Sequence, residues 1–399
     1  MAKNKIKILF IHHGTGIGGA PISLLNLIKR LDKSKFQLKV AFMVRGEIVD
    51  FFKKEDIETE IIGGSTTYFG HHEKGKIQFK FFWRYPKIIL SWYKTRNKLA
   101  PIYLKKNKEY DIIHLNSDVL SSWASAAKQL GFKVVCHNRD PIAKGTFGLR
   151  RYILKYILNK NVNQFICISH DNKSRLGLPQ KTDVIYNFVD IPNTFRESML
   201  DSTIEKRVLY LGGMAKVKGF VTAVACLPYL DPNITLQFAG NLSKWNRPIS
   251  SRDKVIVAIK LLFFGKTYWP LKKMYKAKNA QILGLLYAPL PIIDASDILI
   301  SPFKIEHFSR PAVEAFAYGK PVIGSDVEGM DEIVDHGLNG LLVKKNNPKA
   351  LATAINYLCS HPEKAREMGL EGREKAEKIF SPEINTKKVE NIYQQLINK

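Results

Sequence analysis

Two glutamates, Glu306 and Glu314, have the spacing in this chain that most clearly suggests chemistry. The residues between them predict the start of a short helix, with Ser309 or Arg310 near the cap and Pro311 in the first turn. Such a helix start presents free backbone N–H groups and a partial positive charge, which suits a diphosphate. Glu314 would lie about one turn into the helix and Glu306 on the preceding loop. Both carboxylates are then expected to face the ribose and sugar hydroxyls of one ligand.

Spacing alone leaves a simpler interpretation open, in which Glu314 is a first-turn glutamate favoured by the helix dipole and Glu306 a solvated loop charge. The surrounding residues favour the interpretation in which both glutamates bind a ligand. The pair resembles the E-x7-E signature of retaining glycosyltransferases of the glycogen-synthase-like and mannosyltransferase-like superfamily, and EAFAYGKPVIGSDVEGMDEIVDHGLNGLLV after it is similar to that family almost throughout. The resemblance, to glycosyltransferase family 4 (glycosyl transferases group 1), implies a GT-B fold of two Rossmann-like domains facing across a cleft. It also implies that both glutamates contact the donor, with Glu306 touching the transferred sugar. His307 and Ser309 stand where the family usually has glycine; both are expected to narrow the sugar pocket, and Ser309 is a further predicted donor contact.

The segment LYLGGMAKVKGF resembles the G-R-L-x-x-x-K-G loop of the same family, and Lys218 and Gly219 match the end of that loop. The resemblance implies that the lysine neutralises the leaving diphosphate, which is the main electrostatic task of glycosyl transfer. Gly213 stands where the family usually has arginine, so one expected cation is missing. Lys216 on the same loop, or Arg310, is the predicted replacement.

Three other strand ends match family positions. Gly18 and Gly19 follow the first strand, where a strand–GG–helix element brings backbone amides to the donor diphosphate; a tight turn needing glycine is the alternative. His137 ends the strand KVVCHN and is predicted near the transferring sugar, with a satisfied structural imidazole as the alternative. Gly284 and Leu285 are the residues expected to hold the nucleobase through backbone groups.

The first loop also carries Gly14, Gly16 and Gly19, which formally satisfy the G-x-G-x-x-G fingerprint of dinucleotide-binding proteins. That fingerprint needs an acidic residue at the end of the second strand, and the nearest candidate, Glu47, lies past Arg45 and Gly46. An NAD-dependent oxidoreductase or nucleotide-sugar epimerase is therefore an alternative rather than the main hypothesis.

The sequence predicts neither a metal nor another cofactor. No D-x-D triplet occurs in the chain, and an enzyme that uses a divalent ion to bridge the diphosphate typically needs such a cluster. Lys218 and the helix start are expected to do the work of the cation. The cysteines have no metal-ligand spacing and indicate a reducing compartment; they are Cys136, Cys167, Cys226 and Cys359.

The net charge of +26, with a pI near 9.7, predicts an anionic partner. Nucleic acid is not favoured, because no arginine-rich arm, zinc-finger spacing or RNP-like motif occurs. Residues 74–108 carry eleven Lys or Arg and no acid, and residues 254–279 repeat the pattern. Their large apolar residues could contact anionic lipid or belong to the core; they include Phe81, Phe82, Trp83, Ile88, Ile89, Trp92, Tyr93, Phe263, Phe264, Tyr268 and Trp269.

No apolar run approaches the ~20 residues needed to span a bilayer, and the start of the chain lacks the pattern of a secretory signal. The sequence therefore predicts a cytoplasmic protein, peripheral on the inner face of the membrane. The predicted activity is a hexosyltransferase-like transfer from a nucleotide-sugar donor to a glycan or lipid-linked acceptor, in cell-surface polysaccharide assembly. A basic membrane- or nucleic-acid-binding module is the non-enzymatic alternative.

The elements that must position these residues alternate as short apolar strands and helices along the whole chain, which is typical of parallel α/β sheets. The predicted class is α/β, with two doubly wound domains. We place an acceptor-side domain at 1–190, a donor domain at 191–380 and a terminal helix at 381–399 that returns to the first domain. The polar segment 187–207 is the predicted linker.

Overall fold

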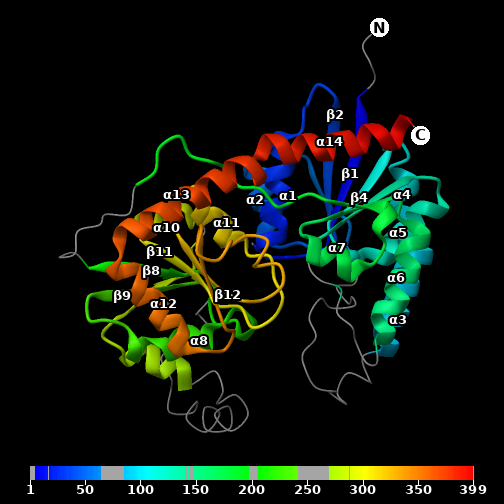
Figure 1. The fold of residues 1–399 in the computed structure, drawn as a ribbon. Helices are drawn as coiled ribbons and strands as arrows, with labels where there is room; N and C mark the ends of the chain where they lie inside the picture. Colours follow the sequence, from blue (N-terminus) through cyan, green and yellow to red (C-terminus); the bar gives the residue numbers. More distant parts are fainter. Residues whose placement is uncertain are drawn as a thin grey trace. The chain divides into compact units, whose positions relative to one another are not determined.

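The computed structural model describes residues 5–16, 18–63, 85–139, 142, 148–196, 205–240, 269–286 and 288–398. The chain forms two compact units, one of Met1–Phe188 with Pro382–Lys399 and the other of Val189–Ser381. Each unit is a parallel sheet with helices on both faces (Figure 1). The predicted class of two doubly wound α/β domains is thus confirmed.

The sheet of unit 1 has the order β3-β2-β1-β4-β5-β6-β7, with every pair parallel. Its strands are β1 Ile6–His12, β2 Phe36–Phe42, β3 Thr59–Ile61, β4 Ile112–Leu115, β5 Lys133–Asn138, β6 Gln164–Cys167 and β7 Thr182–Val184. Its longer helices are α1 Gly19–Arg30, α2 Glu47–Lys54, α3 Tyr85–Lys94, α4 Ala100–Lys106, α5 Ser121–Gln129, α6 Leu149–Asn161, α7 His170–Leu176 and α14 Pro382–Asn398. A π-helical turn, Thr95–Leu99, joins α3 to α4.

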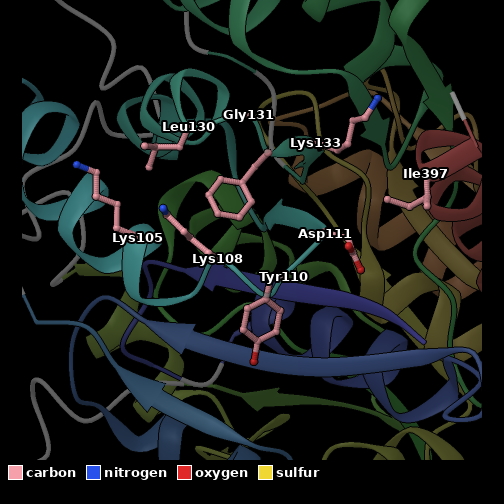
Figure 2. Close-up of a pocket in the computed structure, with 9 residues that line it drawn as sticks. Lys105, Lys108, Tyr110, Asp111, Leu130, Gly131, Lys133 and Ile397 are labelled. Atoms are coloured by element: carbon pink, nitrogen blue, oxygen red, sulfur yellow. The ribbon is translucent and has the colours of Figure 1, made fainter. Parts of the chain in front are cut away.

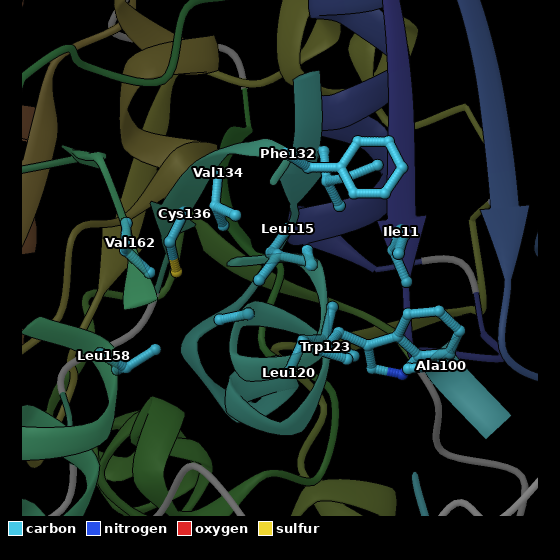
Figure 3. Packing of buried hydrophobic residues seen from close by; sticks show 14 of the residues in the cluster. Ile11, Ala100, Leu115, Leu120, Trp123, Phe132, Val134, Cys136, Leu158 and Val162 are labelled. Carbon is cyan, nitrogen blue, oxygen red and sulfur yellow. The ribbon is translucent and has the colours of Figure 1, made fainter. Parts of the chain in front are cut away.

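Two hydrophobic clusters cover the two faces of this sheet. One joins the strands to α4, α5 and α6, and Figure 3 shows Trp123 packed there among Ile11, Leu115 and Leu120. The other joins the strands to α1, α2 and α14, where Tyr393 is fully buried. The α4–α6 layer thus lies on one face of the sheet and the α1, α2 and α14 layer on the other.

The sheet of unit 2 has the order β10-β9-β8-β11-β12-β13, again all parallel. Its strands are β8 Lys206–Tyr210, β9 Ile234–Ala239, β10 Ala280–Gly284, β11 Ile298–Ser301, β12 Val322–Ser325 and β13 Gly340–Val343. Its longer helices are α8 Phe220–Cys226, α10 Leu290–Ala295, α11 Arg310–Ala317, α12 Pro348–Ser360 and α13 Pro362–Ile379. A 3₁₀ turn, Lys216–Lys218, precedes α8.

The strand order reverses once in each sheet, between β1 and β4 in unit 1 and between β8 and β11 in unit 2. Loops leave in opposite directions at such a point, so a crevice opens beyond the carboxyl ends of the two strands, and ligands of open α/β sheets bind there. The candidate residues lie largely on the loops that follow these strands.

The start of unit 2 is an extended segment held by its own domain. Arg373 donates from Nη2 to the carbonyl oxygen of Pro192 at 2.7 Å, and the amide of Arg196 donates to Asp294 at 2.7 Å. Lys320, which is fully buried, donates to the carbonyl of Arg196. These contacts explain why part of the predicted linker, residues 189–196, belongs to the second compact unit.

Candidate functional site

The loops after β8 and β11 are packed directly against each other. The amide of Lys304 donates to the carbonyl of Val217 at 2.9 Å, which joins the two loops. Gly219 has φ +82°, and a Cβ at this residue would lie 1.8 Å from the carbonyl oxygen of Pro302. Only glycine fits both the backbone conformation and the space. The loop after β8, which carries Lys216 and Lys218 and is called the lysine loop below, therefore takes its shape from the loop that carries Glu306.

The two loops carry three lysines, two after β8 and one after β11. Lys216 is exposed and Lys218 half-buried, as the 3₁₀ turn before Gly219 directs them. Lys304 is half-buried, and desolvation, together with the charge of Lys216, lowers the pKa of its amine. A nearby anion would favour the charged form of such an amine. Sequence reasoning missed Lys304, although its position directly after the buried strand end SPF could have indicated a residue at a ligand edge.

The helix predicted between the two glutamates is present as α11, with Ser309 at the N-cap and Pro311 in the first turn. Ser309 is fully buried, and its hydroxyl accepts a hydrogen bond from Ser301 at 2.8 Å instead of capping the helix. Pro311 has no N–H group, and the amide of Ala312 donates to the carbonyl of Ser309 at 3.1 Å, so among the described contacts of the first turn the amide of Arg310 is the donor left for a ligand. Glu306 lies half-buried on the preceding loop.

Glu314 is only 5% exposed and forms an ion pair with Arg310, one turn earlier on α11, at 2.8 Å. Burial raises the pKa of the Glu314 carboxyl, and the neighbouring guanidinium opposes that rise. Arg310 can therefore act as the predicted replacement cation only if it contacts the diphosphate while it stays paired with Glu314. Because a guanidinium has five N–H donors, it can hold a carboxylate and still donate elsewhere.

Contacts with Phe303 and Glu328 hold the remaining part of the β11–α11 loop. The imidazole of His307 stacks on the ring of Phe303 with 4.1 Å between centroids, and its amide donates to the carbonyl of Glu328 at 3.1 Å. Gly329 approaches the backbone of His307, with φ +83°. His307, where glycine is usual in the family, therefore adds a fixed ring next to Glu306.

The predicted nucleobase residues lie at the carboxyl end of β10. Gly284 has φ +74°, and its carbonyl accepts from the amide of Gly240 at 2.7 Å, which ties the ends of β9 and β10 together. The amide of Gly213 donates to the carbonyl of Ala239 at 3.0 Å. Leu285 is 51% exposed, so an apolar side chain stands in solvent at this edge. The ends of β8, β9 and β10 are thus linked through backbone groups.

In unit 1, Gly18 is the N-cap of α1 and Gly19 its first residue. A Cβ added at either glycine would meet no described atom within 4 Å, so the start of α1 is open. Glu47 begins α2 after Gly46, whereas β2 already ends at Phe42. No acid stands at the end of β2, and the dinucleotide fingerprint is incomplete in the structure as well.

His137 lies at the carboxyl end of β5 within a buried polar cluster. Arg139 donates from Nε to Asn116 at 2.6 Å, from Nη1 to Asn187 at 2.7 Å, and lies 3.3 Å from Nδ1 of His137. Nε2 of His137, and both side-chain polar atoms of Asn138, are buried and have no hydrogen-bond partner among the described residues. Polar atoms in this state are suited to a ligand hydroxyl.

Two imidazoles of this cluster are held neutral. Burial, and then the charge of Arg139, lowers the pKa of His137 and of His114 well below the ordinary value. His114 also shares a 2.7 Å hydrogen bond with the hydroxyl of Tyr393 on α14. His137 can thus exchange a hydrogen bond with a sugar hydroxyl, but at neutral pH it does not supply a positive charge to a phosphate.

We expect unit 1 to lose stability as the pH falls below about 6.5, because the unfolded chain protonates both imidazoles while the folded chain does not. Stability from this source is complete above the unfolded pKa, and each histidine contributes a slope of up to about 1.4 kcal/mol per pH unit below it. Urea unfolding of the whole protein at pH 7.5 and 5.5 measures the effect. His137→Asn should reduce the pH slope, and His361→Asn, at an exposed position, should leave it unchanged.

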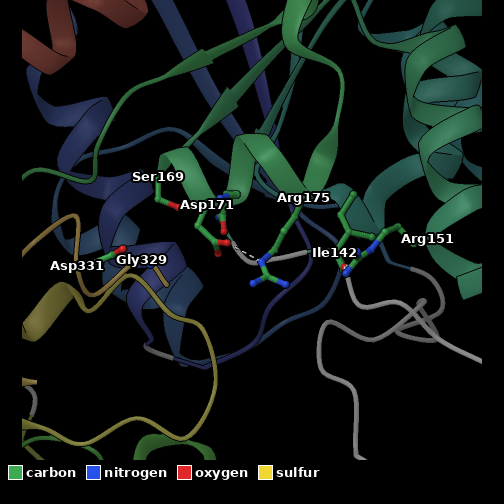
Figure 4. A network of polar contacts seen from close by, with 8 residues as sticks. Ile142, Arg151, Ser169, Asp171, Arg175, Gly329 and Asp331 are labelled. Carbon is green, nitrogen blue, oxygen red and sulfur yellow. Dashed lines mark hydrogen bonds and ion pairs between the residues drawn. The ribbon is translucent and has the colours of Figure 1, made fainter. Parts of the chain in front are cut away.

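Two other polar sites in unit 1 are structural or distant. Ser169 accepts from the amide of Asn172 at 3.0 Å and caps α7, while Asp171 pairs with Arg175 at 2.7 Å (Figure 4). A pocket of about 490 Å³ lies at the amino ends of β4 and β5, and Asp111 and Lys133 line it (Figure 2). This pocket is at the sheet edge opposite His137, so it does not coincide with the candidate site.

Comparison with known proteins decides the family. The family model for glycosyl transferases group 1 matches residues 193–375, and the model for glycosyltransferase family 4 matches residues 17–192. The chain belongs to the family 4 glycosyltransferases of GT-B fold. This family 4 enzyme is 28% identical over 391 residues to an uncharacterised glycosyltransferase of Methanocaldococcus jannaschii, with 95% of each chain covered.

Two further similarities are to a curated glycosyltransferase sequence and to a solved structure. It is 28% identical to the capsular polysaccharide biosynthesis glycosyltransferase CapM of Staphylococcus aureus, over 43% of this chain and 48% of CapM. The crystal structure of HepE from Anabaena, in complex with UDP and glucose, superposes with a TM-score of 0.76 at 19% identity, covering 98% of this chain and 99% of HepE. The structural likeness supports the GT-B fold.

Two properties of the family 4 enzyme concern metals and membranes. Among the described residues, no group of three or more His, Cys, Asp or Glu is placed to hold a metal ion. Within the same residues, no helix has the length and hydropathy to cross a membrane. Metal independence stays a prediction.

Proposed function

We propose that this glycosyltransferase binds a nucleoside-diphosphate sugar at the carboxyl edge of the unit 2 sheet and transfers the sugar with retention of configuration. The observation that carries the proposal is the direct packing of the lysine loop on the β11–α11 loop, which brings Lys216 near Lys304 at the strand-order reversal. HepE, which shares the fold, binds UDP and UDP-glucose, which supports a donor of this chemical class.

The diphosphate would be held by the cations of the β8 and β11–α11 loops and by the start of α11. Lys216, Lys218 and Lys304 neutralise the charge that develops on the leaving phosphate, and the amide of Arg310 adds a hydrogen bond. Gly284 and Leu285 provide backbone groups for the base. This arrangement supports transfer without a divalent ion, which is part of the proposal.

The reaction breaks the bond between the sugar C1 and the β-phosphate oxygen, and forms a bond between C1 and an acceptor hydroxyl oxygen on the same face. The acceptor proton passes to the departing phosphate, so no protein nucleophile is required. Glu306 and the neutral imidazole of His137 are proposed to hydrogen-bond sugar or acceptor hydroxyls. Glu314, buried with Arg310, is proposed to hold a donor hydroxyl rather than to transfer a proton.

The acceptor is proposed to be a glycan or lipid-linked saccharide in cell-surface polysaccharide assembly. The capsule-biosynthesis relative CapM supports this class, as does the net charge of +26, which favours a polyanionic or membrane-borne acceptor.

The test is a panel of nucleotide-sugars, with release of the nucleoside diphosphate as the readout. We expect slow hydrolysis of one donor, and at least about a hundredfold lower turnover in Lys216→Ala/Lys218→Ala, because removing a transition-state charge partner costs about that factor. Lys344→Ala/Lys345→Ala, which removes two exposed lysines from the same unit, is the matched control. Equal turnover of the two double variants would contradict the proposed site.

A further inference from the structure

Helix α6 presents large apolar side chains to solvent on the side opposite the core. Its inner face carries Leu154 and Leu158, which are fully buried. The outer face repeats apolar residues at i, i+3, i+4 and i+7, which places them on one side of the helix. These residues are between 40% and 72% exposed: Leu149, Tyr152, Ile153 and Tyr156.

Helix α3 has the same organisation. Its inner side is fixed to α5, since Trp92 donates from Nε1 to the hydroxyl of Ser121 at 3.0 Å. Its outer side has apolar side chains that are 52% to 60% exposed: Ile89, Leu90 and Tyr93. Pro86, also exposed, completes the i, i+3, i+4, i+7 pattern. Within the part of the chain that the structure describes, both helices thus carry an apolar stripe that no other element covers.

The two stripes belong to one layer of unit 1. Helices α4 and α6 both pack on α5, as does the turn that follows α3, and Figure 1 shows α3 to α6 as a group. In the described part of the chain, nineteen large hydrophobic side chains are strongly exposed, and eight of them lie on α3, α4 and α6, with Ile102 on α4 as the eighth. Apolar exposure is therefore concentrated in this layer.

The charge of the layer identifies its partner. Residues 85–107 and 148–162 contain ten Lys or Arg and no Asp or Glu. The exposed lysines of these residues are Lys87, Lys94, Lys98, Lys105, Lys106 and Lys160. A second copy of this surface would oppose cation to cation, which disfavours a symmetric dimer. An anionic lipid bilayer, which carries negative headgroups with apolar acyl chains just below them, is complementary to this basic and apolar layer.

We propose that unit 1 docks on a bilayer containing anionic lipid through the outer faces of α3 and α6. The tyrosines lie at headgroup depth, the leucine and isoleucine side chains enter the acyl boundary, and the lysines bind lipid phosphate. Two helices of one layer thus hold the protein at the membrane surface. The inference concerns docking alone and does not depend on the donor assigned above.

Co-sedimentation of the whole protein with lipid vesicles tests the docking face, in the absence of any nucleotide-sugar. We expect binding to vesicles of equal parts phosphatidylcholine and phosphatidylglycerol, and little binding to phosphatidylcholine alone. Added salt should weaken the binding, because the lysine contribution is screened. Tyr152→Ser/Tyr156→Ser and Lys87→Gln/Lys94→Gln/Lys98→Gln should each weaken binding at least about tenfold.

Matched variants separate docking from general effects. Tyr229→Ser/Tyr357→Ser and Lys344→Gln/Lys345→Gln/Lys349→Gln change the same residue types at exposed positions of unit 2, outside residues 254–279, and should bind as the unaltered protein does. Tyr152→Trp/Tyr156→Trp should retain binding, because tryptophan also favours the interface. Unchanged melting temperatures confirm that the variants are folded.

Two outcomes would overturn the proposal. The first is vesicle binding that is equal for the α6 variant and its unit 2 control. The second is a dimer in solution that the α6 substitutions dissociate, which would assign the face to a second copy of the chain. If the unaltered protein binds vesicles but hydrolyses no nucleotide-sugar, that result counts only against the proposed function.

The aromatic residues that first indicated lipid contact are only partly described by the structure. Phe81, Phe82, Trp83, Phe263, Phe264 and Tyr268 lie outside the described residues. In the described part of the second segment, Trp269 is 56% exposed, and the amine of Lys272 lies 5.4 Å from the centroid of its ring. The proposed docking face consists of the outer sides of α3 and α6, and the sequence did not indicate α6.

Discussion

Substitution of Gly219 by alanine is expected to reduce sugar transfer at least about a hundredfold, since a misplacement of about 1 Å in a positioning loop costs that factor. The added Cβ would stand 1.8 Å from the carbonyl oxygen of Pro302, so one of the two loops must move. Lys218 directly precedes this glycine, and the amide of Lys304 is bonded to the same loop. Turnover and donor affinity of the purified variant are the measurements.

Gly337→Ala is the matched control for this variant. Gly337 has φ +83°, close to the +82° of Gly219, but a Cβ there meets nothing within 4 Å among the described atoms. It therefore carries only the conformational cost of a left-handed alanine, about 1–2 kcal/mol, without the collision. If Gly219→Ala lost no more activity than Gly337→Ala, the packed loops would not position the donor.

Removal of Arg310 is expected to have the second large effect, a loss of folding stability. Arg310→Ala leaves the buried carboxylate of Glu314 without the guanidinium at 2.8 Å, and breaking one side of a buried pair costs about 3–5 kcal/mol. The pKa of Glu314, already raised by burial, should rise further. Donor affinity should fall as well, if Arg310 also contacts the diphosphate. Urea unfolding and donor binding measure the two effects separately.

The pH dependence identifies the cause of the stability loss. A carboxyl whose pKa is raised in the folded state destabilises the fold at pH values above its unfolded pKa, because the folded state must then keep an unfavourable charge. The deficit of Arg310→Ala should therefore shrink between pH 8 and pH 5. A deficit independent of pH would mean that lost packing, and not an unpaired Glu314, causes the instability.

Two further variants complete this experiment. Arg310→Met/Glu314→Gln removes both charges, and should recover much of the stability while remaining inactive, if the carboxylate holds the donor. Lys378→Ala breaks the exposed pair with Glu374 at the same i, i+4 spacing, and should leave stability nearly unchanged. Full activity in the double variant would contradict the proposed role of Glu314.

Much of the candidate site could be predicted because local chemistry fixes it. Pro311 in a first turn and an apolar strand before Ser301 sufficed to place the helix that begins at Arg310. Short apolar runs between helical patterns predicted buried parallel strands, and both sheets are parallel. Glycines after the first strand predicted a turn into a helix, and α1 begins at Gly19.

Other features depend on neighbours that are distant in the chain. Strands β9, β10 and β11 lie between Lys216 and Lys304 in the chain, so no local pattern predicts that the charge of Lys216 lowers the pKa of Lys304. The buried cluster around Arg139 joins the ends of β4 and β5 to Asn187, which lies close to the end of the first unit. Hydrophobic periodicity does not predict which face of α6 packs on the sheet, because the helix is apolar on both sides.

The sequence by itself determined that this chain forms two doubly wound α/β domains and that it belongs with the glycosyltransferases, because strand periodicity and the E-x7-E and lysine-loop motifs are local properties of the chain. Only the tertiary structure decided which charges are buried, which are paired, and which apolar side chains remain in solvent. Burial and electrostatic coupling are set by the packing of segments that are far apart in sequence, and packing assigns an outside to α3 and α6 that hydrophobic pattern leaves undefined.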